Sequence, residues 1–147
     1  MTQVDFYFNA PDRSMYACRL LRKAAGQGNR IGVWCDDQTM ESLNQSLWQL
    51  NATDFVTHCL SHDEPTRVER SSVVIGSDWS ALGRLQNMRV FLNLNHSVPP
   101  DLNPDLRILE VVGPEEVDKS SARDRWKYYS QAGFQINRHD LASLKVL

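Results

Sequence analysis

The sequence predicts an α/β fold: a mainly parallel sheet with helices on both faces, formed as one domain over residues 1–147. Extended and helical patterns alternate along the chain. We find no internal repeat, low-complexity segment or linker that would divide it. Alternation of this kind is typical of strands joined by crossover helices. A length of 147 residues is sufficient for a single hydrophobic core.

The first half of the chain contains two strand patterns, each followed by a helical one. "QVDFYFN" and "RIGVWC" predict strands over 3–9 and 30–35. Apolar residues recur at helical spacing over 14–28, where glycines end the helix, and over 36–51, where Asp36 or Asp37 provides the cap. One face of the second helix is predicted to consist of Met40, Leu43, Leu47 and Leu50.

The second half repeats the alternation after a polar interruption. Residues 52–71 read as mainly irregular structure, and a proline-rich loop is expected over 96–104. A final helix is predicted over 114–133, with Pro114 and two glutamates in its first turn. Strands are predicted over 72–77, 88–94 and 106–113, the last being the final strand.

Composition excludes several classes of protein. The hydrophobic fraction of 41% is that of a chain that folds. The net charge of −2 means that the protein as a whole has no positive electrostatic field to attract nucleic acid. No run reaches the roughly 18 apolar residues of a membrane span, and no secretory signal pattern opens the sequence. Three widely spaced cysteines favour reduced thiols, and hence a cytoplasmic protein.

The motifs of common α/β enzymes are missing. There is no G-x-x-x-x-G-K-[ST] loop, and "GQGNRIG" is spaced too widely for G-x-G-x-x-G and follows a helix instead of a strand. No G-x-S-x-G motif is found, and "HCLSH" has no second pair of ligands to complete a zinc site. We therefore expect no catalytic residues, no metal and no cofactor.

The predicted final helix carries a concentration of positive charge. Lys119, Arg123 and Trp126 lie within one side of it, and Lys127 lies at the edge of that side. Between residues 119 and 139 there are five basic residues and one acidic residue, a local charge of +4. The basic residues are Lys119, Arg123, Arg125, Lys127 and Arg138, and the acidic residue is Asp124.

Cations beside an aromatic wall suit a ligand that has a carboxylate next to an apolar ring or chain. An arginine can bind the carboxylate through two parallel hydrogen bonds, a lysine adds a point charge, and the aromatic side chain contacts the apolar part. Two alternatives remain open. The helix face could be merely solvated, with its aromatic residues in the core. The face could also bind single-stranded nucleic acid, although five charges would give weak and salt-sensitive binding.

The sequence resembles the chi subunit family of bacterial DNA polymerase III holoenzyme. The segments that carry the resemblance are "VDFYFN", "RIGVWCDDQ", "LWQLNATDFVTHCL" and "KSSARDRWKYYSQAGFQINRHDL". The resemblance implies a Rossmann-like α/β fold without a nucleotide-binding loop. It also implies a non-catalytic subunit of the clamp-loader assembly.

The resemblance further implies the partners. Chi subunits bind the acidic C-terminal tail of single-stranded DNA-binding protein and link it to the replicase, so that DNA is contacted indirectly. The family's tail-binding positions correspond to Lys119 and Arg123, with Lys127 contributing. Trp126 is the adjacent aromatic residue. Tyr129 is expected to be a wall or core residue and not a direct contact.

A second surface is implied for the psi subunit, where the organism has one. The resemblance assigns it to Trp48 and Phe55. Trp48 is one position away from the predicted apolar face of its helix, which favours exposure of its ring. The alternative is that both side chains close the core. A nucleotide-dependent enzyme and a direct single-stranded DNA binder are the other functions that we consider.

Overall fold

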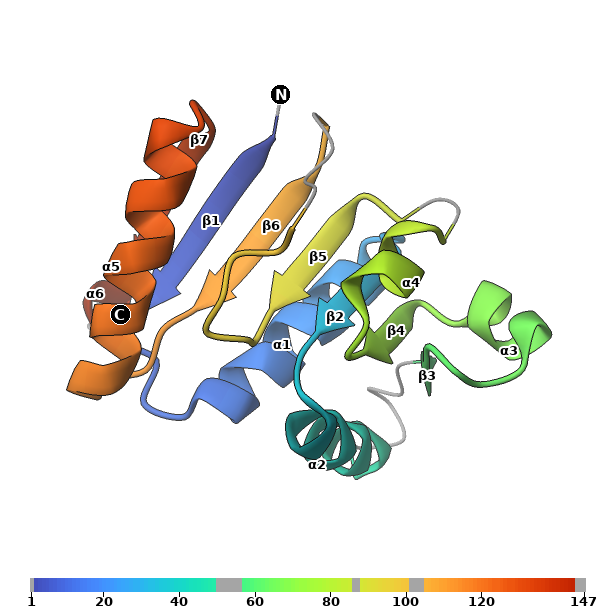
Figure 1. Cartoon of the computed structure of the whole chain (residues 1–147). Coiled ribbons are helices and arrows are strands. Elements are labelled where there is room, and N and C mark those ends of the chain that lie inside the picture. Colours follow the sequence, from blue (N-terminus) through green and yellow to red (C-terminus); the bar gives the residue numbers. More distant parts are fainter. Residues whose placement is uncertain (1, 50–56, 86–87, 101–104, 145–147) are drawn as a thin grey trace.

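The protein is built around one seven-stranded sheet, seen in a computed structural model that describes residues 2–49, 57–85, 88–100 and 105–144 (Figure 1). The strand order is β3-β4-β2-β5-β6-β1-β7, and every pairing is parallel. This confirms the predicted α/β class and the Rossmann-like description. The strands are β1 Gln3–Phe8, β2 Ile31–Trp34, β3 His58–Leu60, β4 Val73–Gly76, β5 Val90–Asn93, β6 Arg107–Val111 and β7 Gln135–Asp140.

Helices lie on both faces of the sheet, as predicted. In Figure 1, α4 and α5 lie in front of the sheet and α1 lies behind it. None of the described helices is long and apolar enough to cross a membrane. The helices are α1 Arg13–Gly26, α2 Asp37–Trp48, α3 Pro65–Arg70, α4 Trp79–Gly83, α5 Glu116–Gln131 and α6 Leu141–Leu144.

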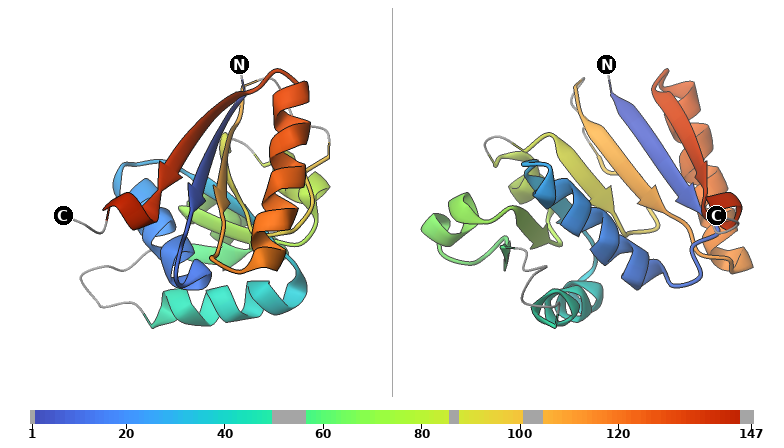
Figure 2. Two further views of the ribbon diagram at one scale, coloured as in Figure 1. Left: turned by 90° about the vertical axis from the view of Figure 1, so that its left-hand side faces the viewer. Right: turned by 180° about the vertical axis from the view of Figure 1, so that it is seen from behind.

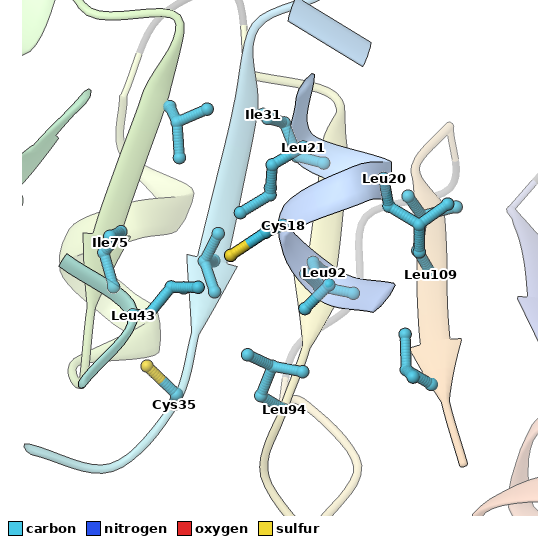
Figure 3. Packing of buried hydrophobic residues seen from close by; sticks show 14 of the residues in the cluster. Cys18, Leu20, Leu21, Ile31, Cys35, Leu43, Ile75, Leu92, Leu94 and Leu109 are labelled. Carbon is cyan, nitrogen blue, oxygen red and sulfur yellow. The ribbon is translucent and has the colours of Figure 1, made fainter. Parts of the chain in front are cut away.

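The core consists of two layers separated by the sheet. Side chains of α1 and α2 pack on one face, where Leu20 and Leu43 meet strand residues such as Ile75 and Leu109 (Figure 3). On the opposite face, residues of α3, α4 and α5 pack against the alternate positions of the same strands. Successive residues of a strand point to opposite faces, so each strand supplies both layers.

Helix ends follow the expected signals. Asp12 and Asp36 cap α1 and α2 by accepting hydrogen bonds from the backbone N–H groups of Met15 and Thr39. Gly28, at φ 80°, follows the end of α1, which confirms that "GQGNRIG" is a helix stop and turn.

Three predictions about the elements were wrong. The segment 52–71 contains β3 and α3, and α4 lies between two strands where no helix was expected. These elements have three to six residues, too few for a periodic pattern. The strand over 106–113 is not the final one, because β7 follows α5. Leu50 of the predicted α2 face lies outside the described residues.

Candidate functional site

A surface hollow of about 600 Å³ lies between α5 and the carboxyl ends of β1 and β6. All four residues predicted for the tail-binding site, Lys119, Arg123, Trp126 and Lys127, line this hollow. The carboxyl ends of strands are where open α/β sheets commonly bind ligands. The other lining residues are Phe6, Phe8, Asn9, Val112, Gly113, Ala122 and Arg138.

The floor of the hollow is aromatic. Phe6 and Phe8 are alternate residues of β1, so both point toward the face covered by α5. The Trp126 ring is partly buried and contacts Phe6, with ring centroids 5.1 Å apart. The floor therefore offers apolar ring surface to a ligand that enters from solvent.

Four cations surround this floor, and the described lining includes no carboxylate. Lys119, Arg123 and Lys127 come from α5, whereas Arg138 comes from β7. The Arg138 guanidinium lies 5.5 Å from the centroid of the Phe8 ring and 5.6 Å from that of Trp126, both cation–π distances. Arg138 is one of the basic residues noted in the sequence, but its place in the hollow depends on β7, which was not predicted.

Arg123 is positioned by a weak ion pair that a ligand can replace. Its Nη1 lies 3.3 Å from Oε1 of Glu116, and both side chains are largely exposed. Exposed pairs of this kind contribute about 0–1 kcal/mol. A ligand carboxylate can therefore take the guanidinium from Glu116 at little cost.

Arg125 does not belong to this surface, which corrects the count of exposed charge from the sequence. Its side chain is 4% exposed, and its Nε donates to Oε1 of the fully buried Glu110 at 3.1 Å. Its Nη1 also donates to the hydroxyl of Ser121 at 2.6 Å. The helix thus presents three cations to the hollow, and the fourth comes from β7.

Glu110 is the centre of a buried polar network that attaches α5 to the sheet. Its Oε2 accepts hydrogen bonds from Tyr129 at 2.7 Å and from Asn93 at 3.0 Å. Burial raises the pKa of Glu110, and the charge of Arg125 opposes that rise. Tyr129 is fully buried, which confirms its prediction as a wall or core residue. The network fixes the rotation of α5, and so turns Lys119, Arg123 and Trp126 toward the hollow.

The second predicted surface is described only in part. Trp48 is 53% exposed at the end of α2, in agreement with the predicted exposure of its ring, and the ring contacts that of His58, with centroids 4.8 Å apart. It lines a shallow depression with residues of α3. Phe55, the other predicted residue of this surface, lies outside the described residues.

Within the described part of the chain, the cysteines form no reactive thiol site, and the residue types that bind metals form no metal site. Cys18, Cys35 and Cys59 are free and buried. Burial raises the pKa of the Cys35 thiol to about 12, with the charges of Asp36 and Asp37 acting in the same direction. Among the described residues, no three His, Cys, Asp or Glu side chains are grouped so that they could hold a metal ion.

The helix ends where a phosphate would bind in a nucleotide enzyme are already occupied by carboxylates. The N-terminal N–H groups of α1 and α2 face the side chains of Asp12 and Asp36. A bound phosphate would have to displace an aspartate and would be repelled by it. This arrangement is consistent with the missing phosphate loop.

Fold and site together define a class: a Rossmann-like α/β protein whose described residues form a cationic, ring-floored hollow without a catalytic constellation. Over residues 1–137 the chain matches the family described as DNA polymerase III chi subunit, HolC. The match covers most of the chain, and the protein belongs to this family. Chi is an accessory subunit of the polymerase and not a catalytic one.

Individual relatives agree with this assignment. The chain is 28% identical to the DNA polymerase III subunit chi of Pseudomonas aeruginosa, with 96% of this chain and 98% of the relative covered. It is 25% identical to the Escherichia coli subunit chi, with 82% and 80% covered. These relatives are similar in length as well as in sequence.

Solved structures with a similar fold include a domain of a yeast DEAD-box protein. The C-terminal domain of the Saccharomyces cerevisiae DEAD-box protein Dbp5 superposes with a TM-score of 0.57 over 92% of this chain and 88% of that domain. The sequence identity is 12%. A second structure of that domain gives a TM-score of 0.55, also at 12% identity. At this identity the likeness concerns the fold alone.

Proposed function

We propose that the protein binds the acidic C-terminal tail of single-stranded DNA-binding protein in the hollow on α5. In doing so it would link the coated template to the clamp-loader assembly of DNA polymerase III in the cytoplasm. The observation that supports this most strongly is the lining of the hollow, where four cations surround three aromatic rings. A chain end that carries carboxylates and a phenylalanine has the complementary chemistry.

The parts of the hollow suggest how the tail would be held. The terminal carboxylate would receive two parallel hydrogen bonds from the Arg123 guanidinium after Glu116 releases it. The phenyl ring would lie against the partly buried rings of Phe8 and Trp126, where it would displace water from apolar surface. Lys119 and Lys127 would attract the acidic residues that precede the chain end.

The affinity expected for such a contact is micromolar, or about −8 kcal/mol. Two or three charge-assisted hydrogen bonds and one buried ring are consistent with this value after the entropy of association is subtracted. Added salt should weaken binding, because exposed charges are screened.

Isothermal titration calorimetry with the last ten residues of the organism's own single-stranded DNA-binding protein tests the proposal. Arg123→Ala should weaken binding by about 1.5–3 kcal/mol, since it removes hydrogen bonds to a charged group. Arg84→Ala, at the exposed C-cap of α4, is the matched control and should leave the affinity unchanged. A peptide without its terminal phenylalanine should bind weakly to all variants. Equal affinities for Arg123→Ala and the wild type would reject the site.

We also propose that the surface around Trp48 faces the psi subunit in organisms that have one. The exposed indole at the end of α2 supports this, because an exposed tryptophan is a frequent centre of binding energy. Trp48→Ala should abolish co-purification with psi, whereas Met15→Ala, another exposed apolar residue, should not. Unchanged co-purification of the Trp48 variant would reject this surface.

A further inference from the structure

One part of the sheet is not covered by a helix in the described chain. Seen from behind, α1 crosses the middle of the sheet and packs on β6, and α6 lies near the ends of β1 and β7, so that most of β1 and β7 is left uncovered (Figure 2, right). Parallel sheets are normally covered on both faces, and their strands are then apolar throughout. Here β1 instead reads Q-V-D-F-Y-F, with polar side chains at alternate positions. The polar character of the side chains on this open face therefore needs an explanation.

The open face is a platform of polar side chains linked to one another. The register places Gln3, Asp5 and Tyr7 of β1 beside Arg107 of β6 and beside Asn137 and His139 of β7. Asp5 accepts from Arg107 Nε at 2.8 Å and from Asn137 at 3.1 Å, and it contacts His139 Nε2 at 3.1 Å. The charge of Asp5 is thus compensated within the platform.

Arg107 and His139 of the platform are accessible from solvent, whereas Asp5 is not. The Arg107 side chain is 45% exposed and the His139 side chain is 38% exposed, whereas that of Asp5 is 3% exposed. The carboxylate that could repel an anion is therefore shielded, and the cation beside it is presented outward.

Three rings form a continuous row across this face. Tyr16 of α1 contacts Tyr7, with centroids 5.6 Å apart, and Tyr7 stacks on His139 at 4.5 Å with nearly parallel planes. β7 is the last described strand at this end of the sheet. The row therefore ends at a ring on an edge strand, where a further flat ring can be added.

Helix α1 adds positive charge beside the platform. Arg19 and Lys23 follow Tyr16 at helical spacing, three and seven residues on, and both are exposed. Burial raises the pKa of the Tyr16 phenol, and the nearby charge of Arg19 opposes that rise. Three cations of this region, Arg107, Arg19 and Lys23, stand against the one carboxylate of Asp5, a sum of +2 for these four groups, although the whole chain carries −2.

We propose that this open face binds a short stretch of single-stranded nucleic acid. A base stacks on the outer face of the His139 ring and extends the row, while phosphates lie against Arg107, Arg19 and Lys23. Stacking rings beside a cationic track are how proteins bind single strands without sequence preference. A duplex keeps its bases stacked on each other, so it has no free base face to add to the row.

The platform sets the size of the contact. Three strands span roughly 10 Å, and the six residues of β1 span about 20 Å. This is room for about three nucleotides, so the contact is weak alone and sensitive to salt. It goes beyond the proposed tail binding, because it adds a direct contact with the template. Tyr7 and Phe6 are neighbours that point to opposite faces, so both ligands can bind at once.

Fluorescence anisotropy with a labelled twelve-nucleotide oligothymidine at 50 mM salt tests this proposal. Arg19→Glu/Lys23→Glu should weaken binding at least tenfold and reduce the slope of log affinity against log salt by about 1.4. The matched control is Arg67→Glu/Arg70→Glu on α3, which makes the same charge change on another part of the protein and should have little effect. His139→Ala should weaken binding about fivefold or more.

The opposite results overturn the proposal. The proposal fails if the protein shows no measurable binding of the oligonucleotide, or if the two double variants lose the same amount of oligonucleotide affinity. It also fails if duplex DNA binds as tightly as the oligonucleotide, or if the acidic tail peptide displaces the oligonucleotide. Loss of oligonucleotide binding in Lys119→Ala/Arg123→Ala would assign the nucleic acid to the hollow instead. The tail peptide should bind Arg19→Glu/Lys23→Glu with wild-type affinity, so failure of either site is distinguished from failure of the other.

Discussion

The Glu110–Arg125 pair provides a sharp test of how α5 is held on the sheet. Glu110 is fully buried and Arg125 nearly so. We expect Arg125→Met to lower the free energy of unfolding by about 3–5 kcal/mol, because it leaves a buried carboxylate without its counterion. The lost bonds to Glu110 and Ser121 are of the same order, at about 1–3 kcal/mol each.

A second substitution separates loss of charge compensation from loss of packing. In Arg125→Met/Glu110→Gln the buried charge is gone, and the side-chain amide oxygen that replaces the carboxylate can still accept from Tyr129 and Asn93. This double variant should therefore be more stable than Arg125→Met alone, by about 1–2 kcal/mol. Urea unfolding followed by tryptophan fluorescence measures the differences.

The neighbouring arginine supplies the control. Arg123→Met changes an exposed side chain of the same helix and should cost at most about 1 kcal/mol. A double variant that is less stable than Arg125→Met would refute the reasoning, since the loss would then come from packing and not from an uncompensated charge.

Three further results are expected. Burial alone would raise the pKa of Asp5, but hydrogen bonds from Arg107 and its neighbours outweigh burial and lower it. The stability that the Asp5 carboxylate adds is therefore complete above about pH 4 and is lost as the pH falls below it. The difference in unfolding free energy between wild type and Asp5→Asn, measured with urea, should shrink from pH 7 to pH 3, and a constant difference would contradict this. Cys35 should react with a thiol reagent only on unfolding, because burial raises its pKa to about 12; rapid labelling of the native protein would count against its burial. ATP, GTP or NAD should not raise the melting temperature, because aspartates cap α1 and α2, and a rise of several degrees would restore the enzyme hypothesis.

The central elements could be predicted because their patterns are strong. β2 is an apolar run, β6 is mostly apolar, and α2 repeats Met40, Leu43 and Leu47 on a single buried face. Helical spacing alone is sufficient to predict the basic and aromatic row of α5, so four of the residues around the hollow could be named from the sequence.

β7 was missed because one of its faces is open to solvent. Its sequence, Q-I-N-R-H-D, contains one apolar residue, so neither alternation nor a hydrophobic run marks it as a strand. Without β7, Arg138 could not be placed over Trp126, and the platform on the other side of the sheet could not be inferred.

Arg125 was assigned to the surface because charge alone suggests exposure. A signal against that assignment is present in β6, where Glu110 is a single carboxylate within an apolar run. A carboxylate in a buried strand requires a partner, and a facing helix is the natural source of one. Which cation of α5 supplies it depends on the rotation of the helix, which only the tertiary structure defines.

The central claim is that the hollow on α5 holds the tail of single-stranded DNA-binding protein. NMR spectra of the 15N-labelled protein test it directly, because each of the four tryptophans gives its own indole N–H signal. Addition of the ten-residue tail peptide should shift the signal of Trp126, which lines the hollow, and leave that of the exposed Trp48 in place. A shift of Trp48 without a shift of Trp126 would contradict the claim.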